Sequence, residues 1–297
     1  MLPIIQKSKI WYAISGTSVV VCIIVLFLWR LNFSIDFTGG SFLAIEFSQG
    51  RPEAQNVLET LKSLDFGEAI LQNAGEKGIN MRFREIDDVK HKEVIRVLKE
   101  KFPGAEERRF ETIGSVIGKE LKTRSLWALG AVLLFVLLFI AWSFRKVSRP
   151  VPSWQYGISA VITLFHDVII TLGAFSALGH YLHIEVGASF IAAILTVLAY
   201  SVSDTIVVFD RIRENLFKMR NVQFSDVVNA SVNQTMHRSI NTSLTILLSL
   251  AAIFFFGGES IKYFALTLII GISIGTYSSI FLASPILVTW QERRKKS

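Results

Sequence analysis

The stretch VGASFIAAILTVLAYSVSDTIVVF, residues 186–209, is mostly apolar and contains one charged side chain, Asp204. An α-helix rises about 1.5 Å per residue, so about 20 residues cross a hydrocarbon core of about 30 Å. The stretch is therefore long and apolar enough to span a membrane. Five similar runs occupy residues 10–29, 126–144, 156–178, 239–256 and 263–290. The sequence predicts an α-helical membrane bundle of six transmembrane helices.

The overall composition argues against several other classes of protein. Of the 297 residues, 51% are hydrophobic, which is more than a soluble core covered by polar surface requires. The formal net charge is +7, but the basic residues sit in short loops beside apolar runs. We therefore expect a lipid bilayer, and no nucleic acid, as the partner of these charges. We find no metal-ligand spacing, phosphate-binding loop or nucleophile–base pair, so we expect no metal, no cofactor and no hydrolytic enzyme.

The distribution of Lys and Arg predicts the orientation of the spans. Basic side chains gather at residues 145–149, in the connection 210–238 and in the tail 291–297, whereas residues 179–185 contain none. Lys and Arg stay on the cytoplasmic side, so both termini and the loop 210–238 should be cytoplasmic. The first run is longer than the apolar region of a signal peptide, and we expect it to remain as an uncleaved span. Within the loop 210–238, residues 224–236 are weakly amphipathic and indicate either a short helix on the inner membrane surface or a plain connector.

Residues 31–125 differ from the rest, because charges are dense and apolar residues alternate as in strands. The expected strands are 41–48, 67–73, 78–84 and 105–113, and the expected helices are 52–64 and 87–101. The order β-α-β-β-α-β predicts a ferredoxin-like α+β domain inserted between the first and second transmembrane helices. The orientation of the spans places this domain in the periplasm. The predicted organisation is thus 1–30 with the first span, 31–125, the remaining bundle at 126–290, and a basic tail at 291–297.

Asp204 is an ionisable side chain inside an apolar run. It either marks a helix end that reaches interfacial water or forms a buried ionisable site, which is costly in lipid unless it is paired or hydrated. The apolar run continues past it to Phe209, which favours burial. Ser201 and Thr205 share its helical face, so their hydroxyls are expected to help hold the carboxylate.

Arg238 begins the fifth span and is followed by the polar residues Asn241, Thr242 and Thr245. The fourth span descends to the cytoplasm and the fifth rises from it, so Asp204 and Arg238 should lie in the same half of the membrane and could meet. Burial disfavours the charged carboxylate and a nearby cation favours it, so such a pair is suited to exchange protons. A membrane potential of 100 mV contributes about 2.3 kcal/mol per charge fully moved, which is enough to bias a conformational equilibrium.

Two further features lie in the third and sixth spans. His166 and Asp167 interrupt the third span, and adjacent residues on a helix point about 100° apart, so we expect them to face different surroundings. Either a structural hydrogen-bonding role or a part in proton transfer is consistent with this pair. Gly271 and Gly275 have the spacing GxxxG, which predicts close packing of the sixth span against another helix.

Several segments resemble the SecF family of the bacterial SecDF protein-export complex. They are DFTGG at 36–40, YSVSDTIVVFDRIREN at 200–215, residues 229–245, and GTYSSI at 275–280. The resemblance extends over essentially the whole chain. The family has Asn immediately before the intramembrane aspartate, where this chain has Ser203, and Ser-Arg-Thr where this chain has His237, Arg238 and Ser239. Serine replaces one hydrogen bond of an amide but not its full donor set.

The resemblance implies membership of the RND superfamily, location in the bacterial inner membrane, and use of the proton-motive force to move and release preproteins. It implies SecD, the SecYEG channel, YajC and YidC as protein partners, with protons as the coupling ion. By resemblance, Asp204 and Arg238 form a proton relay, and Asp36, Phe37, Thr38, Gly39 and Gly40 form a structural motif. The polar side chains that would support the relay are Ser201, Ser203, Thr205, Asn241, Thr242, His166 and Asp167.

Two other functions remain open at this point. An RND-type half-transporter would export lipids or small molecules, and a passive scaffold would only assemble the translocon. The segment 200–215 and the single small domain at 31–125 favour secretion over drug export.

Overall fold

The computed structural model describes residues 1–62, 69–145, 151–219 and 221–296. The expected basic residues Lys146, Arg149 and Arg220 therefore lie outside the described residues. The chain divides into two compact units, one of Met1–Asn32 with Leu126–Ser297 and one of Phe33–Ser125.

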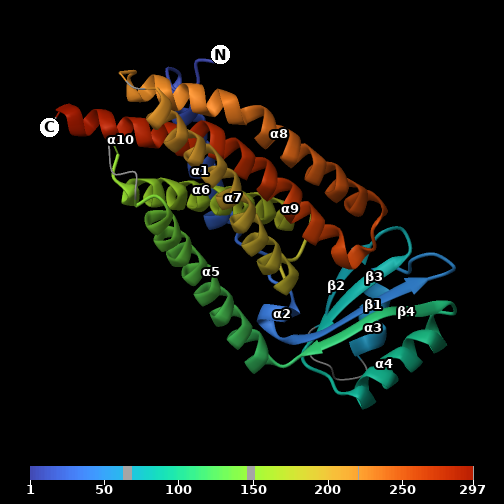
Figure 1. The fold of residues 1–297 in the computed structure, drawn as a ribbon. Coiled ribbons are helices and arrows are strands. Elements are labelled where there is room, and N and C mark those ends of the chain that lie inside the picture. Colours follow the sequence, from blue (N-terminus) through green and yellow to red (C-terminus); the bar gives the residue numbers. More distant parts are fainter. Residues whose placement is uncertain (63–68, 146–150, 220, 297) are drawn as a thin grey trace. The chain divides into compact units, whose positions relative to one another are not determined.

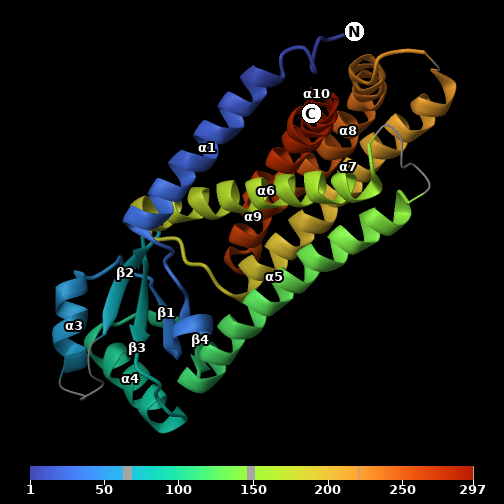
Figure 2. The ribbon, with the colours of Figure 1, turned by 90° about the vertical axis from the view of Figure 1, so that its left-hand side faces the viewer.

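Six helices are long and apolar enough to cross a membrane, as predicted. Five of them are α1 (Ser8–Trp29), α5 (Ser115–Ser143), α6 (Ser153–Leu182), α7 (Ala188–Lys218) and α8 (Phe224–Phe256). The sixth is continuous through three elements, α9 (Glu259–Ser278), the π-helical turn η1 (Ser279–Ala283) and α10 (Ser284–Lys296). Within the first unit α1 lies against α6, and α9 contacts α6, α7 and α8 (Figures 1 and 2).

The spans differ in how much of their surface the chain itself covers. In the apolar 18-residue stretch of each helix, 56% of the residues of α6 are buried, compared with 6% for both α1 and α5. Large apolar side chains such as Phe27, Phe135 and Trp142 remain exposed on the latter two helices. Apolar surface of this kind suits contact with lipid or with another apolar helix.

The connection between the fourth and fifth spans differs from the expectation. Residues 224–236 are not a separate surface helix, because α8 runs without interruption from Phe224 to Phe256. The stretch contains no Gly or Pro to break the helix. Its first turns bury Phe224, Val228 and Val232 within the chain. Most of the expected loop 210–238 is therefore helical, since α7 also extends to Lys218.

The second unit has the predicted order β-α-β-β-α-β, preceded by a short helix, α2 (Ile35–Thr38), that was not predicted. The elements after it are β1 (Gly40–Phe47), α3 (Ala54–Lys62), β2 (Ile70–Ala74), β3 (Gly78–Phe83), α4 (Asp88–Lys101) and β4 (Ala105–Ile113). The sheet is antiparallel, with strand order β2-β3-β1-β4. The expected first residues of β2, at 67 and 68, lie outside the described residues.

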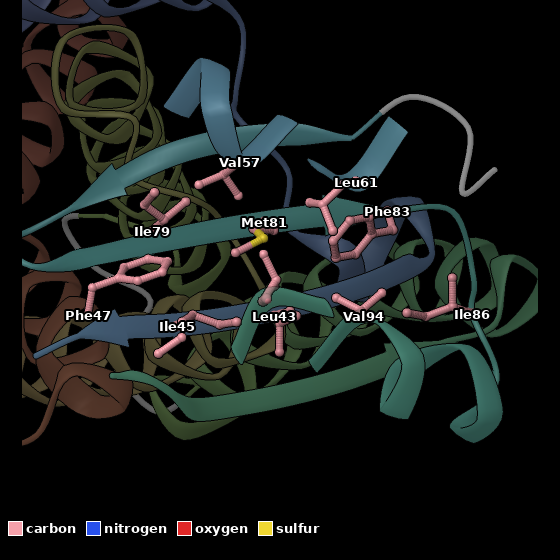
Figure 3. Packing of buried hydrophobic residues seen from close by; sticks show 12 residues of the cluster. Leu43, Ile45, Phe47, Val57, Leu61, Ile79, Met81, Phe83, Ile86 and Val94 are labelled. Atoms are coloured by element: carbon pink, nitrogen blue, oxygen red, sulfur yellow. The ribbon is translucent and has the colours of Figure 1, made fainter. Parts of the chain in front are cut away.

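The core of this unit lies between the sheet and its two longer helices (Figure 3). Alternate residues of β1, namely Leu43, Ile45 and Phe47, point into it. Val57 of α3 and Val94 of α4 are both fully buried against this face. Strands with a period of two and helices with apolar stripes thus bury their hydrophobic faces against each other.

The motif 36–40 forms a tight turn into β1. Ser34 Oγ accepts a hydrogen bond of 3.2 Å from the backbone N–H of Asp36, and the hydroxyl of Thr38 donates to the carbonyl of Ser34. Gly39 and Gly40 have φ angles of 73° and 114°, which favour glycine. A Cβ atom on Gly40 would lie 2.6 Å from the carbonyl oxygen of Phe83 in β3. The two glycines therefore allow both the tight backbone turn and the close approach of Gly40 to the backbone of β3.

Candidate functional site

Asp204 is buried between helices, with only 8% of its surface exposed. It projects from α7, and its Oδ1 accepts a hydrogen bond of 2.6 Å from Ser239 Oγ on α8. Its Oδ2 accepts a hydrogen bond from Ser279 Oγ at the first residue of η1. Asp204 thus belongs to a buried site and does not mark a helix end in water.

Asp167 is the second buried carboxyl group, and it is fully inaccessible. It projects from α6 and accepts hydrogen bonds from Ser201 Oγ on α7 at 2.6 Å and from Ser278 Oγ on α9 at 2.9 Å. His166 Nδ1 lies 2.9 Å from Asp167 Oδ1. The expectation that His166 and Asp167 face different surroundings is wrong, because the imidazole folds back onto its neighbour and is itself 5% exposed.

Consecutive serines connect the two carboxyl groups to the same turn of the sixth span. Ser278 donates to Asp167 and Ser279 donates to Asp204. Successive helical residues point about 100° apart, so neighbouring hydroxyls can reach side chains on two different helices. This turn is where α9 changes to the π-helix η1, and π-helical turns occur frequently at functional sites.

The glycines of the sixth span allow α9 to approach α7, as the GxxxG spacing predicts. A Cβ atom on Gly271 would lie 2.3 Å from Cγ2 of Val197. A Cβ atom on Gly275 would lie 3.0 Å from Cβ of Ser201 and 3.6 Å from Oδ2 of Asp167. Close contact at these glycines therefore positions the hydroxyl and carboxyl groups of the site.

Arg238 does not meet Asp204 in this structure. Its side chain is exposed, and the ion pairs among the described residues do not include one between these two groups. The reason is the helical period, because Ser239 faces Asp204 and thereby turns the preceding residue away. The expected polar stripe of Arg238, Asn241, Thr242 and Thr245 does share one side of α8, but all four residues are exposed.

The remaining supporting residues also differ from the expectation. Ser201 holds Asp167 and not Asp204, while Ser203 is exposed. Thr205 is buried, but its hydroxyl has no hydrogen-bond partner among the described residues. Helical spacing placed these residues near Asp204 but did not determine which carboxyl group each one reaches.

Hydroxyl groups that sequence reasoning did not assign to the site extend it along α8 and α9. Ser243 Oγ lies 2.9 Å from the hydroxyl of Tyr200 and 2.6 Å from that of Thr276. It also donates to the backbone carbonyl of Ser239 at 2.9 Å. Two features of the sequence could have indicated these hydroxyl groups. They are the consecutive serines Ser278 and Ser279 after the glycines of α9, and the four-residue spacing of Ser239 and Ser243, which places both on one face of α8.

The side chains that bind the two carboxyl groups carry no permanent charge. Serine hydroxyls donate hydrogen bonds to Asp204 and to Asp167, and the imidazole of His166 pairs with Asp167. The described residues contain no group of His, Cys, Asp and Glu that could hold a metal ion.

Comparison with known proteins gives a consistent family. The family described as "Protein export membrane protein SecD/SecF, C-terminal" matches residues 93–293. Protein translocase subunit SecF of Thermobaculum terrenum is 39% identical over 99% of this chain and 95% of its own length. The subunit of the same name from Vibrio alginolyticus is 38% identical over 94% of this chain and 86% of its own length.

Solved structures agree with this result. The crystal structure of SecDF, a translocon-associated membrane protein from Thermus thermophilus, matches with a TM-score of 0.85 at 32% identity. The match covers 97% of this chain but only 38% of the SecDF chain. A further structure, of SecDF in a super-membrane-facing form, matches with a TM-score of 0.70. Because the family match spans more than half of the chain and a relative named SecF is 39% identical over nearly its full length, the chain belongs to the SecF family of protein translocase subunits.

Proposed function

We propose that this chain is a proton-coupled subunit of a protein translocase, which acts with a SecD partner to move and release preproteins across the bacterial inner membrane. The observation that carries the proposal is Asp204, a carboxyl group buried inside a membrane bundle and held by hydroxyls from two other helices. Protonation would remove its charge and change which hydrogen bonds it makes with α8 and η1. This would bias the packing of those helices.

Arg238 supports the proposal from the outer face of α8. An exposed arginine beside Asn241 and Thr242 is costly against lipid, so this face is suited to a polar partner helix. A proton relay of Asp204 and Arg238 would then require either rotation of α8 or a partner that joins the two groups. The match to only 38% of a SecDF chain fits a chain that forms one part of a larger machine.

The proposed topology follows from the charge distribution. Both termini would be cytoplasmic, and residues 31–125 would form a ferredoxin-like periplasmic domain between the first two spans, with 126–290 as the remaining bundle and 291–297 as a basic tail. The strand order β2-β3-β1-β4 with two helices in the core supports the ferredoxin-like assignment. SecYEG, YajC and YidC are proposed as the further partners, and no hydrolytic step is assigned to this chain.

The test is preprotein release from proteoliposomes that contain the chain with its SecD partner and a proton gradient. Asp204→Asn and Arg238→Met should each reduce proton-dependent release by at least tenfold. Asp210→Asn and Arg213→Met are matched controls, because these side chains form an exposed ion pair at 2.7 Å on the same helix as Asp204. Unchanged release in both site variants would indicate a passive scaffold.

A deletion strain separates secretion from export of lipids or small molecules. Secretion predicts preproteins stalled in the membrane, and the wild-type chain but not Asp204→Asn should clear them. Accumulated lipids or drugs with normal preprotein processing would instead favour the half-transporter.

A further inference from the structure

We infer that Asp167 is a second proton-binding group, coupled to Asp204 through the adjacent hydroxyls of Ser278 and Ser279. The inference rests on the proposed function, because it extends the proton site of Asp204 to a pair of carboxyl groups on two helices. The geometry that carries it is the joint between α9 and η1, where one serine donates to each carboxyl group.

Asp167 is surrounded by groups that can form hydrogen bonds with either form of a carboxyl group. It is fully buried, it accepts hydrogen bonds from the hydroxyls of Ser201 and Ser278, and His166 Nδ1 lies 2.9 Å from its Oδ1. None of its three partners carries a permanent positive charge. Among the described residues, titratable side chains that face this region are His166 on α6, Asp204 and Tyr200 on α7, and Tyr277 on α9, with Cys22 of α1 against Gly173 nearly two turns away.

His166 provides a second observation in favour of proton binding at Asp167. Its Nδ1 is engaged with Asp167, while its Nε2 is buried and has no hydrogen-bond partner among the described residues. In the tautomer that carries its proton at Nδ1, a proton that binds Nε2 converts the neutral ring to an imidazolium. The Nδ1 proton can then pass to Asp167 Oδ1, which leaves a neutral imidazole protonated at Nε2 and a neutral carboxylic acid.

The two serines can switch partners without large movement. Ser278 Oγ lies 2.9 Å from Asp167 Oδ2 and 3.1 Å from the carbonyl oxygen of Gly275. Ser279 Oγ is bonded to Asp204 Oδ2 and lies 3.0 Å from the carbonyl oxygen of Thr276. A hydroxyl has one proton, so it can donate to only one of these acceptors at a time. A protonated carboxyl group can donate to the serine oxygen, and the serine then donates to the carbonyl.

The two switches act on the same backbone turn, which explains why they should be coupled. The protonation state of each carboxyl group determines whether its serine donates to that carboxyl group on another helix or to a backbone carbonyl of α9. Since the serines are consecutive, protonation of one group changes the geometry that the other group meets.

The experiment uses the chain with its SecD partner in liposomes and difference infrared spectroscopy after a pH step, which detects the carbonyl band of protonated Asp. The chain has 24 Asp and Glu residues, and two of the titrating bands should belong to Asp167 and Asp204, each assigned by its loss in the corresponding Asn variant. Asp167→Asn should remove one band and move the midpoint of the other by about one pH unit, a tenfold change in proton affinity. Asp204→Asn should move the remaining midpoint by the same amount, because coupling is reciprocal.

Ser278→Ala and Ser273→Ala form a matched pair on α9. Ser278 reaches Asp167, whereas Ser273 is exposed and donates only to the carbonyl of Ile269 at 2.7 Å. Ser278→Ala should shift both midpoints, and Ser273→Ala should shift neither. These variants also test the inference if Asp167→Asn fails to fold.

The outcomes separate the inference from the proposed function. If Asp204 titrates and supports proton-dependent release, but Asp167→Asn and Ser278→Ala leave its midpoint unchanged, the coupling is overturned and the proposed function stands. If Asp204→Asn and Arg238→Met both retain full proton-dependent release, the proposed function fails, whatever the infrared bands show.

Discussion

Ser239 Oγ donates a hydrogen bond of 2.6 Å to Oδ1 of Asp204 across the interface of α8 and α7. Ser239 is 1% exposed, whereas its neighbour Arg238 is exposed. A single residue step along α8 therefore separates the inner face that holds the carboxyl group from the outer face that carries the arginine. The conformation described here is one in which a hydroxyl, and not a cation, faces Asp204.

Removal of the Ser239 hydroxyl should weaken the contact between α7 and α8. In Ser239→Ala the buried carboxyl group of Asp204 keeps only one of its two hydroxyl donors, that of Ser279. The loss of a partner from a buried polar group costs about 1–3 kcal/mol, so we expect a loss of stability of this size in thermal unfolding of the purified protein in detergent. Ser249→Ala is the control, because Ser249 is exposed and, among the described residues, donates to the carbonyl of Thr245. A loss of equal size in both variants would contradict this role.

A side chain at Gly271 should separate α9 from α7. The Cβ atom of Gly271→Ala would lie 2.3 Å from Cγ2 of Val197, and a β-branched side chain has little freedom to move away. We expect a loss of stability of about 1–3 kcal/mol, measured by thermal unfolding of the purified protein in detergent. Gly130→Ala should have little effect, because nothing lies within 4 Å of its Cβ position. Recovery in the double variant with Val197→Ala would show that the contact itself is responsible.

The turn at 36–40 predicts different effects at two glycines. Gly40 and Gly50 both have positive φ, at 114° and 102°, so alanine is strained at either position. Only at Gly40 does the added Cβ also meet an atom, the carbonyl oxygen of Phe83 at 2.6 Å. Gly40→Ala should therefore accelerate amide hydrogen exchange throughout β1 and β3, while Gly50→Ala should act only locally. Equal exchange in the two variants would mean that strain in φ accounts for the whole effect.

The amino-terminal segment is attached to α8 by an asparagine. Asn229 Oδ1 accepts hydrogen bonds from the backbone N–H groups of Ile4 and Ile5, at 3.0 and 3.2 Å. Both isoleucines are buried. In Asn229→Ala these N–H groups lose their acceptor, so their hydrogen exchange should become at least tenfold faster.

Asn241→Ala provides the comparison for this attachment, since Asn241 is an exposed residue of the same helix. Exchange at Ile4 and Ile5 should remain slow in that variant. Slow exchange in Asn229→Ala as well would show that burial of the two isoleucines, together with the bonds between Asn233 and the backbone of Leu2, holds the segment without Asn229.

The sequence by itself determined the spans and the order of elements in the sheet unit. Residues 186–209 and the other runs predicted six membrane helices, because length and apolar composition are properties of each segment alone. The alternating residues of β1 predicted a strand with one buried face for the same reason. The glycines of α9 likewise predicted a close helix contact before its partner was known.

Only the tertiary structure decided which side chains meet inside the bundle. The sequence placed Asp204 and Arg238 at similar depths, but depth does not define how each helix is rotated about its axis. That rotation depends on all the contacts of the helix, including the approach of Gly271 to Val197, and it turned Ser239 inward and Arg238 outward. If a helix rotates by about 100° about its axis, the residue that faces a neighbouring helix is replaced by the next one in the sequence. The partners of a side chain across an interface therefore follow from packing and not from spacing along a single helix.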